Sequence, residues 1–135
     1  MTQSPTPPGM LIAVLPCNDV DVSERFYARL GFERTGPSAH EFAATYRILS
    51  NGKGGFLHLA KAEDGWLVPG KNPCQLYLYA EDVDALAAAM APDVLGKGPE
   101  DKPWGMYEFA MSDPDEILVR VGWPSRLRKS PPTTT

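Results

Sequence analysis

The sequence predicts an α+β domain made of two similar halves, each with the order strand, helix, strand, strand, strand. Each half opens with an alternating apolar segment and continues with a segment of helical spacing. Both helical segments begin with the same tripeptide at matching places, Asp19-Val20-Asp21 in the first half and Asp82-Val83-Asp84 in the second. Chance could explain two short words alone, but the shared order of elements favours an internal repeat.

The first half is expected to extend over about residues 10–62. MLIAVLPC alternates like a strand, and Asp19 is placed to cap the helix that follows. Phe26, Tyr27 and Leu30 stand at helical spacing, and Gly31 is a C-terminal stop signal. Three further strands are predicted at about 32–37, 42–49 and 55–61, with the turn signal NGKGG before the last of them.

The second half is expected over about residues 74–123. CQLYLYA is its first strand, Asp82 is the candidate helix cap, and Pro92 ends the helix. The apolar stripe of this helix consists of Val83, Leu86, Ala87 and Met90. Strands are predicted at about 93–96, 104–111 and 117–123. A Gly/Pro-rich linker covers 63–73, and residues 1–9 and 124–135, rich in Pro, Ser and Thr, are expected to be disordered.

Length and composition indicate one soluble globular domain. The chain has 135 residues, 43% hydrophobic and 22% charged, with a formal net charge of −4. An acidic body disfavours nucleic acid and favours cationic ligands, although mild acidity can also serve solubility alone. No segment is long and apolar enough for a membrane span or signal peptide, so a cytoplasmic protein without membrane partners is expected. Cys17 and Cys74 make no disulfide framework, and both are expected to be reduced.

Strand alternation predicts a second sheet face, away from the helices. If Leu76 and Leu78 pack against a helix, Gln75, Tyr77 and Tyr79 point the other way. The same reasoning puts Phe56, His58, Ala60, Leu118 and Arg120 on that face. Tyrosines, a histidine, a glutamine and an arginine suit a partly buried concave surface better than a freely solvated one.

The last hairpin offers a charged pair. A turn centred on Pro114 would set Glu108 directly opposite Arg120 on the same face. Such a cross-strand pair contributes about 0.2–1 kcal/mol.

Two longer stretches, NDVDVSERFYARLGF and PWGMYEFAMSDPDEILVRV, resemble the vicinal oxygen chelate superfamily of glyoxalases, bleomycin resistance proteins and dioxygenases. The resemblance covers about residues 10–123, and the closing stretch is most similar to the bleomycin resistance proteins. It implies two βαβββ modules that form cup-shaped half-barrels, and a homodimer in which modules are exchanged between chains.

The resemblance also implies where a catalytic metal would lie. The matching positions here are Ile12, His58, Gln75 and Arg120. Ile12 has no ligating atom, and Arg120 is a permanent cation that repels a metal. We therefore expect no metal, no cofactor and no catalytic residue. The family turn has Gly where this chain has Glu116, which predicts a different turn geometry.

Bleomycin-binding relatives hold the drug without chemistry, stacked between aromatic side chains in a groove at the dimer interface. The matching aromatic residues here are Phe42 and Trp104, with Trp66 at the rim and Glu108 as a candidate acid for a cationic ligand. Phe42 could instead be a core residue, Trp104 a packed strand residue, and Tyr77 and Tyr79 could simply fill the cup. The expected ligand-binding residues are Phe42, His58, Trp66, Gln75, Tyr77, Tyr79, Trp104, Glu108 and Arg120.

These expectations lead to one function and one rival, and a third possibility is that the cup binds an unrelated metabolite. The first is non-catalytic binding and sequestration of a bleomycin-type or other flat cationic small molecule, which would confer resistance. The rival is a metal-dependent glyoxalase-like lyase or thiol transferase of the same superfamily.

Overall fold

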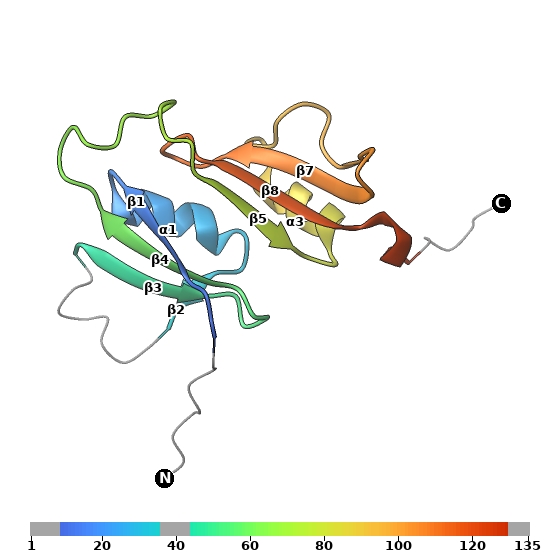
Figure 1. Cartoon of the computed structure of the whole chain (residues 1–135), viewed down its shortest axis with the longest axis horizontal. Helices are drawn as coiled ribbons and strands as arrows, with labels where there is room; N and C mark the ends of the chain where they lie inside the picture. Colours follow the sequence, from blue (N-terminus) through green and yellow to red (C-terminus); the bar gives the residue numbers. More distant parts are fainter. Residues whose placement is uncertain (1–8, 36–43, 130–135) are drawn as a thin grey trace, which may run out of the picture.

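A computed structural model describes residues 9–35 and 44–129 and contains two modules (Figure 1). The first consists of β1 (Ala13–Cys17), α1 (Val20–Ala28), β2 (Glu33–Arg34), β3 (Tyr46–Ser50) and β4 (Phe56–Lys61). The second consists of β5 (Gln75–Tyr79), α3 (Val83–Met90), β6 (Glu100–Asp101), β7 (Met106–Ser112) and β8 (Leu118–Pro124). The predicted α+β class and the duplicated βαβββ order are confirmed.

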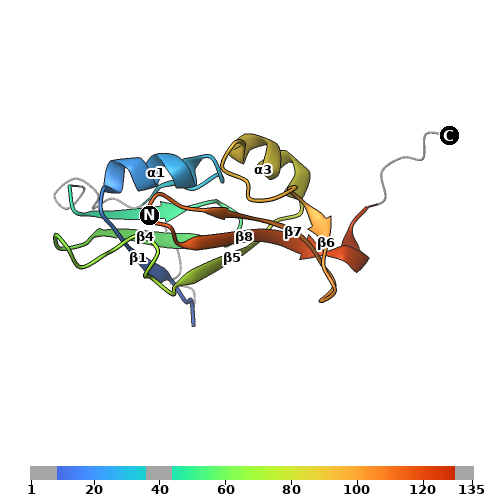
Figure 2. The ribbon, with the colours of Figure 1, turned by 90° about the horizontal axis from the view of Figure 1, so that it is seen from above.

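Each module forms a four-stranded sheet, and the two sheets have equivalent strand orders. The orders are β1-β4-β3-β2 and β5-β8-β7-β6. In both, the first strand pairs in parallel with the last, and the remaining pairs are antiparallel. Figure 2 shows α1 and α3 side by side on the same side of the two sheets. The opposite side of the sheets carries no helix, and we call it the open face.

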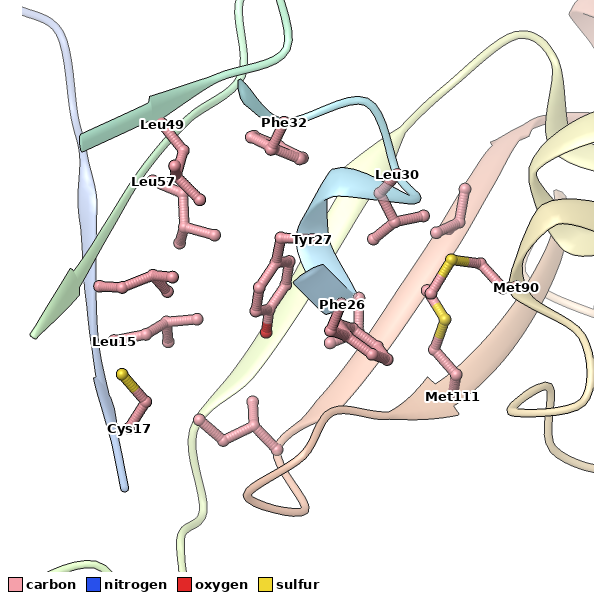
Figure 3. Packing of buried hydrophobic residues seen from close by; sticks show 14 of the residues in the cluster. Leu15, Cys17, Phe26, Tyr27, Leu30, Phe32, Leu49, Leu57, Met90 and Met111 are labelled. Atoms are coloured by element: carbon pink, nitrogen blue, oxygen red, sulfur yellow. The ribbon is translucent and has the colours of Figure 1, made fainter. Parts of the chain in front are cut away.

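A single hydrophobic core lies between the helices and the sheets and continues across both modules. Leu15, Leu49 and Leu57 fill it in the first module, and Met90 and Met111 fill it in the second. In Figure 3 Phe26 and Tyr27 of α1, with Leu30 just after the helix, lie between these two groups. Helix α1 therefore contributes to the core of both modules, so we expect the modules to unfold together.

Local signals mark both ends of α1. Asp19 caps α1 as predicted, since its Oδ1 accepts hydrogen bonds from the backbone N–H of Asp21 at 2.9 Å and of Val22 at 3.2 Å. At the other end, Gly31 adopts a φ of 93°, and the N–H of Phe32 bonds to the Tyr27 carbonyl.

The prediction that the Asp82 side chain caps α3 is wrong, because that side chain makes no capping hydrogen bond. Helix α3 is instead held by packing. Val83 and Met90 of the predicted stripe are buried, and Leu86 and Ala87 pack against the core.

Several predicted strand limits need correction. The segment 93–96 forms only a single bridge, between Val94 and Met111, and β6 comes later. Strand β7 begins at Met106, so Trp104 lies in the turn before it. Strand β3 begins at Tyr46, and Phe42 lies outside the described residues. The segment 124–129, predicted as disordered, contains the end of β8 and a short 3-10 helix, Ser125–Leu127.

The register of the last hairpin also differs from the prediction. Glu108 pairs with Gly122, and Arg120 pairs with Ala110, so Glu108 and Arg120 are diagonal neighbours on one face and not directly opposite. The turn is longer than predicted because the Asp113 Oδ1 accepts the N–H groups of both Asp115 and Ile117.

The expected change of turn geometry at Glu116 does not occur. Glu116 has a φ of 62°, the left-handed conformation that the family's glycine would favour. The chain therefore keeps the turn and accepts a strained glutamate in it.

The side chains of α1 also bond to this turn. The Tyr27 hydroxyl donates to the Asp113 Oδ2 at 2.8 Å, and the Ser23 hydroxyl donates to the Asp115 Oδ2 at 3.4 Å. All four residues are buried. These bonds join a helix of the first module to the β7–β8 turn of the second.

Among the described residues, no helix is long and apolar enough to span a membrane.

Candidate functional site

The open face brings together most of the residues predicted to bind a ligand. In β5, Leu76 and Leu78 pack against the core, and Gln75, Tyr77 and Tyr79 point outward as predicted. In β8, Val119 and Val121 are buried in the core, which leaves Leu118, Arg120 and Gly122 on the open face. Because the sheets are helix-covered on one side only, this face is the place where a flat molecule can lie against side chains of several strands.

Glu108 is the polar centre of the second module's open face. It is only 3% exposed, and its Oε1 accepts two hydrogen bonds. The Tyr77 hydroxyl donates one at 2.9 Å, and the Trp104 indole Nε1–H donates the other at 2.8 Å. Burial and the hydrogen bond to Glu108 raise the pKa of Tyr77, so the phenol stays protonated and remains a donor. Glu108 therefore fixes the positions of two aromatic rings.

Gly122 makes this arrangement possible. It lies beside Tyr77 and Glu108, and a Cβ at this position would come within 2.2 Å of the Tyr77 hydroxyl oxygen and 2.9 Å of the Glu108 Cβ. Any side chain here would push Tyr77 away from Glu108. The sequence alone gave no reason to single out this glycine, because its role depends on a register that had been placed two residues off.

The aromatic rings at this site are held in place yet accessible. Trp104 is 60% exposed although its Nε1 is bound, and Tyr79 is 61% exposed. The rings of Tyr77 and Tyr79 are adjacent, with centroids 5.3 Å apart and an interplanar angle of 54°. Fixed, exposed rings lose little entropy on binding, which suits them to stacking.

The first module has a different polar pair on its open face. The His58 Nδ1 is 2.6 Å from the Tyr46 hydroxyl oxygen, and the two rings meet edge to face with centroids 5.3 Å apart. His58 was predicted to bind a ligand, and its Nδ1 is engaged with Tyr46. Tyr46 was not predicted. Its position opposite Ala60 in β3 and its alternation with buried Arg47 could have indicated it.

Two of the residues predicted to bind a ligand are not among those that the structure places on the open face. Phe42 belongs to the undescribed segment 36–43. Trp66 is 79% exposed and lines a different hollow, formed by the linker with Lys61, Leu67 and Lys71. Within one chain, the linker hollow and the Glu108 cluster are separate surfaces.

The positions that could hold a metal do not have suitable donors. His58 engages its Nδ1 with Tyr46, and Gln75 is a neutral ligand at the start of β5. Ile12 and Arg120 provide no lone pair. In the described part of the chain, no three His, Cys, Asp or Glu side chains gather as metal ligands would. A divalent ion needs more donors, and usually negatively charged ones, so these residues do not fit the metal of the related enzymes.

Comparison with known proteins agrees with the fold described here. Residues 9–121 match the family model of the Glyoxalase/Bleomycin resistance protein/Dioxygenase superfamily. None of the curated proteins matches the chain.

Three solved structures illustrate the range of similar proteins. A bleomycin-binding protein complexed with bleomycin is 24% identical, with a TM-score of 0.65 over 84% of this chain and 96% of that one. TnmS3, an antibiotic binding protein from Streptomyces sp. CB03234, is 26% identical, with a TM-score of 0.62 over 84% of this chain and 93% of that one. A lactoylglutathione lyase from Agrobacterium tumefaciens is 22% identical, with a TM-score of 0.61 over 90% and 98%.

Proposed function

The chain belongs to the Glyoxalase/Bleomycin resistance protein/Dioxygenase superfamily, and from this premise we propose that it binds and sequesters a flat small molecule without transforming it. Bleomycin is the first candidate ligand, and resistance to it would follow from mass action. The observation that carries the proposal is the Glu108 cluster, in which an exposed Trp104 ring is fixed by a buried carboxylate. Similar structures include a protein with bleomycin bound and an antibiotic binding protein.

The rival function, metal-dependent lyase or transferase chemistry, has less support. A lactoylglutathione lyase shares the fold, but at 22% identity the likeness concerns the fold alone. The donor set at the matching positions is Ile12, His58, Gln75 and Arg120, which lacks any carboxylate. Binding without chemistry needs no such set.

We also propose that the protein works as a homodimer in which the second copy covers part of the open face. That face leaves large apolar groups exposed, among them Val14 at 53%, Tyr79 and Trp104. A second copy would turn the open face into a groove and bring the first module of one chain towards the second module of the other. Sedimentation equilibrium over a range of concentrations would test this, and a monomer at all concentrations would contradict it. A cytoplasmic location remains a prediction from the sequence.

Fluorescence titration with bleomycin tests the binding proposal. We expect saturable quenching at about one ligand per chain, since a symmetric dimer has two equivalent grooves. Trp104→Phe should remove most of the quenching, and Trp104→Ala should weaken binding by about 2 kcal/mol, as the loss of a stacking anchor does.

Two further variants locate the site. Trp66→Phe should leave the quenching in place, because Trp66 lies in the linker hollow. Gly122→Ala should weaken binding although residue 122 itself presents only a methyl group, because it displaces Tyr77 from Glu108. Quenching that disappears in Trp66→Phe alone would move the site to the linker. The absence of any response to bleomycin would reject this drug as the ligand.

A further inference from the structure

Arg120 has no partner among the residues that the structure describes. It lies in the middle of β8, paired in register with Tyr77 on one side and Ala110 on the other. It makes no hydrogen bond or ion pair with any described residue, and it is half-buried. A guanidinium group that has lost part of its water and gained no protein partner is poised to bind an acceptor from outside.

Glu108, the diagonal neighbour of Arg120, is engaged with other residues. Glu108 is a diagonal neighbour on the same face, but the two side chains form no ion pair within 4.0 Å. The Oε1 of Glu108 is held by Tyr77 and Trp104, and the residue is 97% covered. The acid that the sequence suggested for a cationic ligand is therefore occupied in fixing the aromatic rings.

The central strands of the described open face carry few charged side chains. The outward residues of β1, β3, β4 and β5 are apolar, aromatic or neutral polar groups, and β7 and β8 add Glu108 and Arg120. The short edge strands add Glu33 in β2, paired with the outward Ser50, and Glu100 in β6, paired with Glu108. An unpaired cation on an apolar, aromatic surface attracts an anion more strongly than a solvated lysine would, because the surrounding side chains screen it less.

The geometry of a guanidinium group selects the kind of acceptor. Its planar fork matches a carboxylate with two parallel hydrogen bonds. Tyr77 stands beside Arg120 in the next strand, and Tyr79 stands beside Tyr77. A ligand with an aromatic plane and an acidic group at its edge could therefore stack on the tyrosines while its acid meets Arg120.

We propose that Arg120 is the anchor for an anionic group, so that the preferred ligands of the open face are flat aromatic molecules that carry a carboxylate or a similar oxyanion. This inference rests on the proposed binding of a flat molecule, and it ranks an anionic ligand ahead of bleomycin, which belongs to the cationic class. It differs from the cationic class that the acidic composition suggested, because the Glu108 Oε1 is engaged and Arg120 makes no hydrogen bond or ion pair with the residues that the structure describes.

Two matched probes test the ligand class. 2-Naphthoate and 2-naphthamide have the same flat ring, and only the first is an anion. Isothermal titration calorimetry should give about tenfold or tighter binding of naphthoate, since a hydrogen bond to a charged partner contributes more than a neutral one. Arg120→Gln should abolish this preference by lowering the affinity for naphthoate to the level of naphthamide, and Arg120→Lys should retain part of it.

Arg25→Gln is the matched control. It changes the net charge by the same amount, but it lies in the last turn of α1, on the helix-covered side. It should preserve the preference for naphthoate. Far-ultraviolet circular dichroism should show that Arg120→Gln folds normally, because Arg120 makes no bond that the substitution would break.

The outcomes separate this inference from the function on which it rests. Equal binding of both probes, with no effect of Arg120→Gln, would overturn the anion anchor while leaving the open face as a binding surface. Failure of both probes to bind would also overturn it, and the bleomycin titration would then decide separately whether the face binds flat molecules. If Arg25→Gln removed the preference for naphthoate as fully as Arg120→Gln, the preference would come from the net charge of the protein. That result would overturn the specific role of Arg120.

Discussion

The first module caps its helix with side-chain hydrogen bonds and has only a small polar pair on its open face. The second module has no side-chain cap on its helix and has the larger polar cluster on its open face. Asp19 caps α1 and Asp82 leaves α3 uncapped. On the open face, the first module offers Tyr46 and His58. The second offers the Glu108 cluster and Arg120, which forms no ion pair within the described ranges 9–35 and 44–129. A duplicated fold can thus keep its topology while one copy specialises for stability and the other for contacts.

Leu59→Ala tests whether the two modules also unfold separately. Of the variants proposed here, it should lower the free energy of unfolding most. Leu59 is fully buried in the first module, and we expect a loss of about 2–5 kcal/mol in the free energy of unfolding. Because one core spans both modules, tryptophan fluorescence from the second module and circular dichroism should report the same shifted transition.

Val14→Ala is the control, since Val14 is 53% exposed and should cost under about 0.5 kcal/mol. Two separate transitions in Leu59→Ala would show that the modules unfold independently.

Tyr27→Phe tests the link between the modules and should cost about 1–3 kcal/mol near neutral pH, because the Asp113 carboxylate loses a donor. Burial raises the pKa of Asp113, so folding is favoured at low pH and this contribution is lost as the pH rises through the folded-state pKa. The Tyr27 hydrogen bond lowers that pKa, so removing it raises the pKa further. The cost of Tyr27→Phe should therefore be larger at about pH 7 than at about pH 4.

Urea unfolding at both pH values checks this prediction. Tyr79→Phe, at an exposed hydroxyl, should show no such dependence. A cost of Tyr27→Phe that is the same at both pH values would mean that Asp113 does not titrate in the folded protein over this range.

The two helix caps can be compared directly. Asp19→Ala should lower the free energy of unfolding by about 1 kcal/mol, because the N–H groups of Asp21 and Val22 lose their acceptor. Asp82→Ala should cost much less, because that side chain accepts no capping bond. Thermal unfolding of both variants measures the difference, and equal losses would remove the contrast between the helices.

Glu116→Gly should give the smallest effect and the opposite sign. The left-handed φ of 62° strains a residue with a Cβ, so glycine should stabilise the protein by about 0.5–1 kcal/mol. Glu116→Ala keeps the Cβ and should give no such gain. Equal stabilisation by alanine would point to the charge of Glu116, and not to its backbone, as the cause.

Much of the fold could be predicted from the sequence because the signals are local. Alternation identified the outward side chains of β5, and Asp19 with Gly31 marked both ends of α1. Strand limits after α3 were predicted less well, since the segment 93–96 was predicted as a strand but makes only one bridge.

The sequence predicted most residues of the candidate site but not the hydrogen bonds between them. The hairpin register depended on how the Asp113 side chain closes its turn, which sequence spacing does not reveal. With the register two residues off, the bonds from Tyr77 and Trp104 to Glu108 and the role of Gly122 could not be seen. Trp104 was expected in a strand, and its place in the turn explains its exposure.

The position of Tyr27 between the two modules has a consequence for the history of such a repeat. A half-length chain carrying only the first module would leave Tyr27, Leu30 and their neighbours facing water. Burying that apolar surface would require a second copy of the short chain. A duplication that joined two such copies would have turned an association between molecules into one within a molecule, and would have freed the second copy to change its open face.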